Sequence, residues 1–133
     1  VQRLIMRHYS FVINPLLGRG HGERGTRRVA SGFLRIVTQQ NFPNGPTPLN
    51  QALAVIDSLM AQPQANWVHP GGRHWEVFRM LCQKSRGAGK AVADAQHAAI
   101  AIEHAATWVS RDRDFHRFAA LGLQFDEWAP EVL

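Results

Sequence analysis

Short apolar strands alternate with helical patterns along this chain, and this alternation constrains its fold more than any other feature. Strand-like runs occur at 65–69 (ANWVH) and 107–110 (TWVS), and each is preceded by a helical segment. A strand followed by a helix and then by another strand is the repeating unit of a mostly parallel sheet covered by helices. The sequence therefore predicts an α/β fold with a short, mostly parallel central sheet flanked by helices.

Four segments carry the helical periodicity. In 26–40, Val29, Phe33 and Val37 recur at helical spacing before a turn rich in Asn, Gly and Pro. In the next helix, Thr47 is the predicted N-cap and Pro48 the first residue. One buried stripe is expected there, formed by Leu49, Ala52, Leu53, Ile56, Leu59 and Met60. Two more helices are predicted at 73–86, with Trp75 on the apolar side, and at 91–106, where many alanines imply close packing against neighbouring elements.

The first 25 residues lack this order and are strongly basic. SFVIN (10–14) is compatible with a short strand, whereas GRGHGERG (18–25) predicts a loop or a disordered arm. Residues 1–35 contain seven arginines and one glutamate, and the other 98 residues hold 8 basic and 9 acidic side chains. The chain is therefore divided into an atypical basic segment, 1–25, and one domain, 26–133.

Composition excludes several classes of protein. A chain of 133 residues with 45% hydrophobic residues can bury one core without disulfides or metal staples. No apolar run approaches the roughly 20 residues of a membrane-spanning helix, and the opening residues do not resemble a signal peptide. The single cysteine, Cys82, is expected to pack as a small apolar residue. These features predict a cytoplasmic protein without membrane contact.

Three carboxylates are candidates for chemistry. Asp112 and Asp114 follow the strand 107–110, at the sheet edge where α/β proteins bind ligands, and Asp94 lies near the start of the helix before that strand. Clustered carboxylates suit Mg²⁺, which prefers oxygen ligands. The alternatives are an N-cap for Asp94 and a solvated surface turn for the other two. In that turn the aspartates would pair with Arg111, Arg113 and Arg117. The nearby GAGK lacks the remaining residues of a phosphate-binding loop.

The order of several motifs resembles a known family. VADAQHAAIAIEHAATWVSRDRDFHRF (92–118) is similar to the closing signature of PIN-domain ribonucleases, in particular the VapC toxins of bacterial toxin–antitoxin pairs. GFLRIVTQQNFPNGP (32–46) and HPGGRHWEVFRML (69–81) resemble the middle of the same subfamily. The resemblance extends from about Val29 to about Pro130 and implies a PIN-like three-layer fold.

The resemblance implies a type II toxin that cleaves RNA with Mg²⁺ or Mn²⁺. Asp94 and Asp112 would be metal ligands, Asp114 a further catalytic acid, and Ser110 the small hydroxyl residue that precedes the late acid. Cations beside the site would bind the RNA backbone without sequence selectivity. These are Arg111, Arg113 and Arg117. The family further implies a homodimer and a cognate antitoxin protein.

The chain departs from the family pattern near its beginning. PIN domains open with a strand that ends in an aspartate, whereas this chain has no aspartate before Asp57 and carries Asn14 at the nearest matching position. One hypothesis is that a frameshifted or mis-started frame encodes the first segment. A second function therefore stays open beside the ribonuclease: a catalytically impaired PIN-like remnant that acts only by binding an antitoxin or a second copy of itself.

Overall fold

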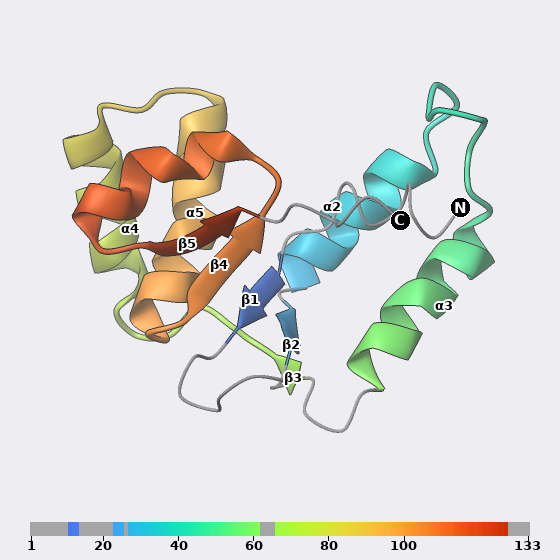
Figure 1. Ribbon diagram of the computed structural model, residues 1–133, viewed down its shortest axis with the longest axis horizontal. Helices are drawn as coiled ribbons and strands as arrows, with labels where there is room; N and C mark the ends of the chain where they lie inside the picture. Colours follow the sequence, from blue (N-terminus) through green and yellow to red (C-terminus); the bar gives the residue numbers. More distant parts are fainter. Residues whose placement is uncertain (1–10, 14–22, 26, 62–65, 128–133) are drawn as a thin grey trace.

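The computed structural model describes residues 11–13, 23–25, 27–61 and 66–127 (Figure 1). In chain order the elements are β1 (Phe11–Ile13), β2 (Glu23–Gly25), α2 (Arg27–Val37), α3 (Leu49–Met60), β3 (Asn66–Trp67), α4 (His74–Ser85), α5 (Lys90–Glu103), β4 (Thr107–Ser110), the 3₁₀ helix η2 (Arg113–Leu121) and β5 (Gln124–Glu127). The α/β class predicted from the sequence is confirmed. None of the helices in the described ranges is both long and apolar enough to cross a bilayer.

The five strands form one sheet in the order β3-β2-β1-β4-β5. β1 is antiparallel to both of its neighbours, β2 and β4. β2 pairs with β3 in parallel, and β4 pairs with β5 in parallel. Because β2 and β4 both oppose β1, four strands share one direction. Their carboxyl ends therefore face the same edge of the sheet, which is the edge that β4 leaves at Ser110.

The larger apolar core joins β4 to α4, α5 and η2, which lie together at one end of the molecule in Figure 1. In α5 the residues Ala95, Ala98, Ala99 and Ala101 are fully buried, as the alanine-rich sequence predicted. Their short side chains let α5 approach α4 and β4 closely, and dense packing of this kind is the main source of core stability. This core fixes the position of α5 relative to the end of β4.

A smaller core lies between α2 and α3, where Phe33, Val37, Ala52 and Ile56 are buried. The predicted stripe of α3 is wrong in part, since the side chains of Leu49 and Leu53 are 57% and 42% exposed. The reason is that α2 covers only one side of α3. The predicted N-cap is also wrong: Pro48 holds the cap position, and the Thr47 amide donates instead to the Val37 carbonyl at 2.8 Å.

Three other local predictions are wrong. Glu23–Gly25, predicted as part of a loop, forms β2, because strand pairing uses main-chain groups that any residue supplies. Arg113 and Asp114, also predicted in a loop, begin η2. Trp75 was placed on the apolar side of α4, but its side chain is 68% exposed.

His97 of α5 provides a pH-dependent test of the larger core. Its ring stacks on Trp108 with a centroid distance of 5.3 Å, and its Nδ1 is buried without a hydrogen-bond partner among the described residues. Burial, assisted by the charge of Arg28, lowers the pKa of His97 from 6.5 to about 4. The unfolded chain therefore takes up a proton below pH 6.5 that the folded chain does not accept until about pH 4.

We accordingly expect His97 to contribute stability near neutral pH that is lost as the pH falls from about 6.5 to about 4. The loss is roughly 3 kcal/mol, since the pKa falls from 6.5 to about 4 and one pKa unit corresponds to about 1.4 kcal/mol. Urea unfolding of the wild type and of His97→Phe at several pH values measures this loss as the change with pH in the difference between their free energies of unfolding. Parallel pH profiles of the two proteins would contradict this expectation.

Candidate metal centre

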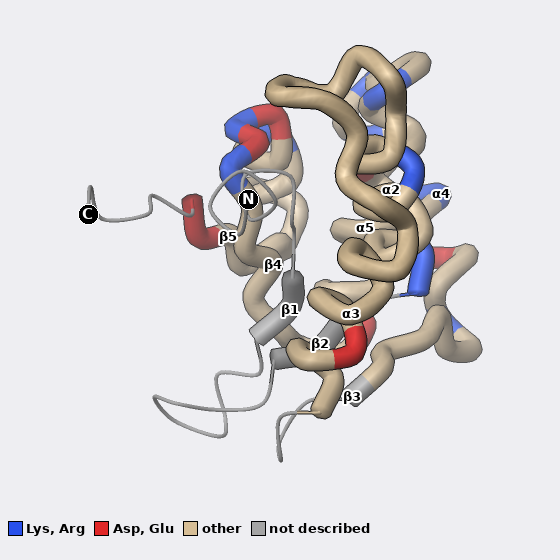
Figure 2. Tube along the Cα trace, turned by 90° about the vertical axis from the view of Figure 1, so that its right-hand side faces the viewer, with Lys and Arg blue, Asp and Glu red and all other residues tan. Residues whose placement is uncertain are grey.

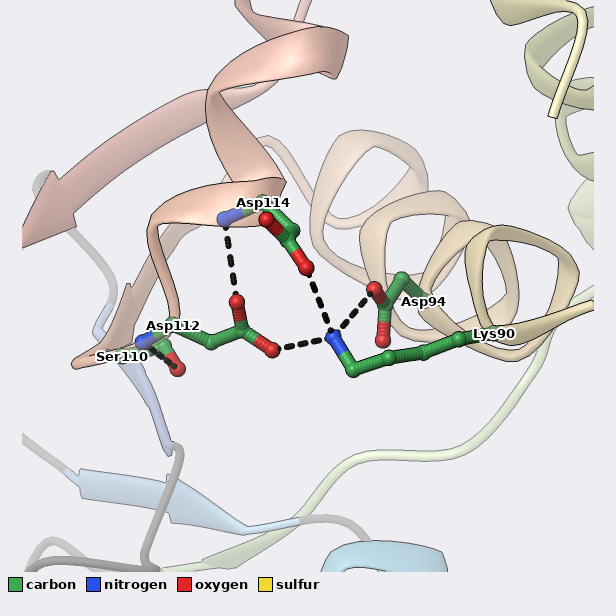
Figure 3. Close-up of polar contacts among 5 residues, drawn as sticks. All are labelled: Lys90, Asp94, Ser110, Asp112 and Asp114. Carbon is green, nitrogen blue, oxygen red and sulfur yellow. Dashed lines mark hydrogen bonds and ion pairs between the residues drawn. The ribbon is translucent and has the colours of Figure 1, made fainter.

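Three carboxylates lie together at the carboxyl end of β4. One oxygen from each of Asp94, Asp112 and Asp114 falls within 4.8 Å of the others (Figure 3). Asp94 comes from α5, whereas the other two lie at the start of η2, where acidic and basic residues alternate along the chain (Figure 2). The structure thus brings together residues 18 to 20 positions apart in the sequence, since it packs the beginning of α5 beside the end of β4.

Asp94 is the most enclosed of the three. It lies in the second turn of α5, which begins at Lys90, so the alternative that Asp94 is an N-cap is wrong. The N-cap position belongs to Gly89. The Asp94 side chain is only 11% exposed, compared with 35% for Asp112 and 60% for Asp114. A carboxylate this buried needs a cationic side chain or a metal ion as its partner.

Asp112 is held by a compact turn between β4 and η2. Its backbone amide donates to Ser110 Oγ at 3.1 Å, and its own Oδ1 accepts from the Asp114 amide at 2.9 Å. Asp112 is therefore the N-cap of η2, which fixes one carboxylate oxygen and leaves Oδ2 directed at the cluster. Ser110 is buried and braces this turn through its hydroxyl.

Lys90 lies among the three carboxylates. Its Nζ donates to Asp94 Oδ2 at 3.0 Å, to Asp112 Oδ2 at 2.5 Å and to Asp114 Oδ2 at 3.2 Å (Figure 3). The side chain remains 60% exposed, so it reaches the cluster from the solvent side. A single ammonium group thus serves as the counter-ion for three acids.

This arrangement shifts the pKa values of Asp94 and Asp112 in opposite directions. Burial raises the pKa of Asp94 above its usual value, and the bond to Lys90 offsets only part of that effect. Partial burial also raises the pKa of Asp112, but Lys90 and the Asp114 amide outweigh it and hold the Asp112 pKa below its usual value. Burial lowers the pKa of Lys90, but its three carboxylate partners outweigh burial and hold this pKa above its usual value. At neutral pH the cluster therefore contains a fixed ammonium and at least one firmly ionised carboxylate.

The donor set fits a hard divalent cation. All three acids offer oxygen, the described residues add no sulfur or imidazole ligand to the cluster, and its solvent-facing side leaves room for the waters that Mg²⁺ retains. Three aspartates alone would supply fewer ligands than the six that Mg²⁺ needs, so water must complete the shell. Any cation placed between the carboxylates must share that space with the Lys90 ammonium.

The arginines predicted to bind RNA lie around this cluster without bonding to its acids. Arg113 pairs instead with Glu127 of β5, with Nε and Oε1 2.7 Å apart. Arg111 and Arg117 are exposed. The alternative interpretation of Asp112 and Asp114 as acids of a turn neutralised by arginines is therefore wrong, because the direct partner of both is Lys90.

Lys90 is the residue of the cluster that the sequence analysis missed. The periodicity predicts helices at 73–86 and 91–106 with Lys90 between them, whereas α5 begins at Lys90. The available signal was its spacing: Lys90 and Asp94 are four residues apart and share one face of a helix. Asn14, the position closest to the family's opening aspartate, lies outside the described residues.

A comparison with protein families gives the class of the chain. Residues 26–121 match the PIN domain. The match includes all four residues of the cluster. The chain belongs to the PIN domain family.

Its relatives within that family are VapC ribonucleases. The chain is 43% identical over 93 residues to VapC ribonuclease Mb2897 of Mycobacterium bovis, which covers 70% of this chain and 63% of that relative. It is 39% identical over 93 residues to Ribonuclease VapC31 of Mycobacterium tuberculosis, covering 70% and 66% of the two chains. Ribonuclease VapC33 of the same species is 36% identical over 103 residues, covering 77% and 72%. The chain thus spans slightly less than two thirds of the length of the first two relatives.

Proposed function

We propose that this protein is the toxin of a type II toxin–antitoxin system and a metal-dependent endoribonuclease. The observation that carries this proposal is the convergence of Asp94, Asp112 and Asp114 at the sheet edge of a PIN domain. The names of its relatives, which describe ribonucleases, support the same conclusion. In this proposal the fold is the three-layer PIN arrangement, and β1 and β2 belong to its sheet.

In this proposal Asp94 and Asp112 hold Mg²⁺ or Mn²⁺, and Asp114 is the third catalytic acid. A bound divalent ion would activate water and stabilise negative charge on the phosphodiester being cut. Asp94 provides a rigid ligand because packing against α4 fixes α5. Asp112 provides a second, because its turn leaves Oδ2 pointing toward Asp94. Asp114, the most exposed acid, is best placed to orient a water or the substrate.

The RNA backbone would lie along the start of η2, where Arg111 and Arg117 reach solvent. We expect Arg111→Ala to weaken RNA binding several-fold and to reduce the salt dependence of binding by about one unit of log–log slope, as removal of one phosphate contact does. Arg113→Ala serves as the matched comparison and should have the smaller effect, because Arg113 already pairs with Glu127. Fluorescence anisotropy at several salt concentrations measures both variants, and equal losses would contradict the assignment.

The partners in this proposal are RNA, a cognate antitoxin and a second copy of the chain, all in the cytoplasm. Exposed apolar side chains support association with another protein: Leu49 and Leu53 on α3, and Trp75 on α4. The mass of the purified protein in solution, measured by light scattering, tests the homodimer. A genomic search for a short antitoxin frame beside the coding sequence tests the pairing.

The test of the activity is cleavage of RNA by the purified chain. Cleavage should require Mg²⁺ or Mn²⁺ and should stop when EDTA is added. The sequence of β1, FVI, includes no acidic residue, and this supports the catalytically impaired remnant as the second candidate. A protein that binds its antitoxin but cleaves no RNA at any metal concentration would establish that candidate.

A further inference from the structure

The position of Lys90 has a consequence for the metal centre. Its Nζ lies 2.5–3.2 Å from one oxygen of each acid in the cluster, and these are the oxygens directed at one another in Figure 3. A cation that bridged Asp94 and Asp112 would meet the same two oxygens. The ammonium and the metal therefore require one space, and their charges repel at such short range.

Lys90 can leave the cluster without moving the acids. Lys90 is the first residue of α5, and its side chain is 60% exposed on a flexible four-carbon stem. The acids, in contrast, are held by helix packing and by the Ser110–Asp112–Asp114 turn. Displacing the ammonium would leave the carboxylates in place. The structure thus combines fixed acids with a removable counter-ion.

We propose that Lys90 is an internal competitor of the metal: it neutralises the acidic cluster in the metal-free protein and must leave when a divalent cation binds Asp94 and Asp112. Lys90 thereby lowers the affinity for metal and stabilises the metal-free domain. This inference rests on the proposed metal site and adds a regulator to it. In this proposal Lys90 contacts the carboxylates that would bind the metal and competes with the metal for them.

The experiment compares Lys90→Met, which removes the charge at similar length, with Lys90→Arg, which retains it. Lys84→Met is the matched control, because Lys84 is exposed on α4 and makes no ion pair with the described residues. Mn²⁺ binding by calorimetry and thermal unfolding with and without Mn²⁺ are the measurements. Neither of them depends on RNA cleavage.

Lys90→Met should bind Mn²⁺ about tenfold more tightly than the wild type, because the ammonium that pairs with all three acids no longer competes with the metal. Without metal its Tm should fall by roughly 4 °C, because three acids lose their counter-ion, and Mn²⁺ should raise its Tm more than that of the wild type. Lys90→Arg and Lys84→Met should bind Mn²⁺ like the wild type. If Lys90→Met fails to fold, Lys90→Gln provides the same comparison.

Unchanged or weaker Mn²⁺ binding by Lys90→Met, alongside measurable binding by the wild type, would overturn the competitor role and leave the metal site intact. Tighter binding by Lys84→Met as well would also overturn it, since net charge alone would then explain the gain. If none of the proteins binds Mn²⁺, the proposed metal site fails together with this inference. RNA cleavage, measured separately, tells whether the ribonuclease activity fails too.

Discussion

Replacing Asp94 with asparagine should reduce metal-dependent RNA cleavage by at least about a hundredfold, since even partners that only support metal ligands are worth 10- to 100-fold. Asparagine keeps the size and one oxygen of aspartate but removes the charge that a divalent cation requires. Because Asp94 is only 11% exposed and lies on a packed helix, the other two acids of the cluster are held on a different element and do not take over its position. Cleavage of RNA at saturating Mg²⁺ measures the loss.

Asp57→Asn is the control for Asp94→Asn. Asp57 lies on α3, is exposed and does not belong to the acidic cluster, so its replacement changes the net charge equally while leaving the cluster intact. Its cleavage rate should match that of the wild type. Persistence of cleavage in Asp94→Asn, or in wild-type protein treated with EDTA, would show that the nuclease activity does not come from this site.

The second large effect concerns stability. Trp108→Ala should lower the free energy of unfolding by about 3–5 kcal/mol, as truncation of a large core aromatic does. Trp108 is 1% exposed at the centre of the larger core, where it stacks on His97 and contacts the Phe115 ring at a centroid distance of 5.2 Å. Alanine would leave a cavity between α5, β4 and η2. Urea unfolding followed by circular dichroism measures the change.

Trp108→Phe separates ring packing from hydrogen bonding. The Nε1 of Trp108 is buried and has no hydrogen-bond partner among the described residues, so phenylalanine gives up no bond there. Its cost should be clearly smaller than that of alanine, because phenylalanine fills more of the space and leaves a smaller cavity. Equal destabilisation by alanine and phenylalanine would indicate that the indole N–H, and not the ring, stabilises this core.

Much of the site could be anticipated from the chain alone. Asp112 and Asp114 follow an apolar strand directly, and Asp94 lies on the helix before that strand, so both groups were expected at one sheet edge. Lys90 could not be placed in the same way. Its assignment depended on where α5 begins, and helix boundaries shift with packing by one or two residues. A shift of one residue moved Lys90 from a loop onto the face that carries Asp94.

The exposed leucines of α3 illustrate the other limit of the sequence. Periodicity indicates which residues share a face, but it does not show how much of that face a neighbour covers, and here Leu49 and Leu53 stay exposed beside the α2–α3 core. Charge pairing has the same limit. Arginine and aspartate residues alternate at 111–114, yet Asp112 and Asp114 pair with Lys90, and Arg113 pairs with Glu127.

Local periodicity and chain order were enough to predict the α/β class, the four helices of 27–103, the close packing of the alanine-rich α5 and the acids at the end of β4. The antiparallel direction of β1, the strand at Glu23–Gly25 and the ammonium of Lys90 among three carboxylates became known from the folded structure. These features depend on contacts between residues far apart in the chain, whose geometry arises when separate elements pack together.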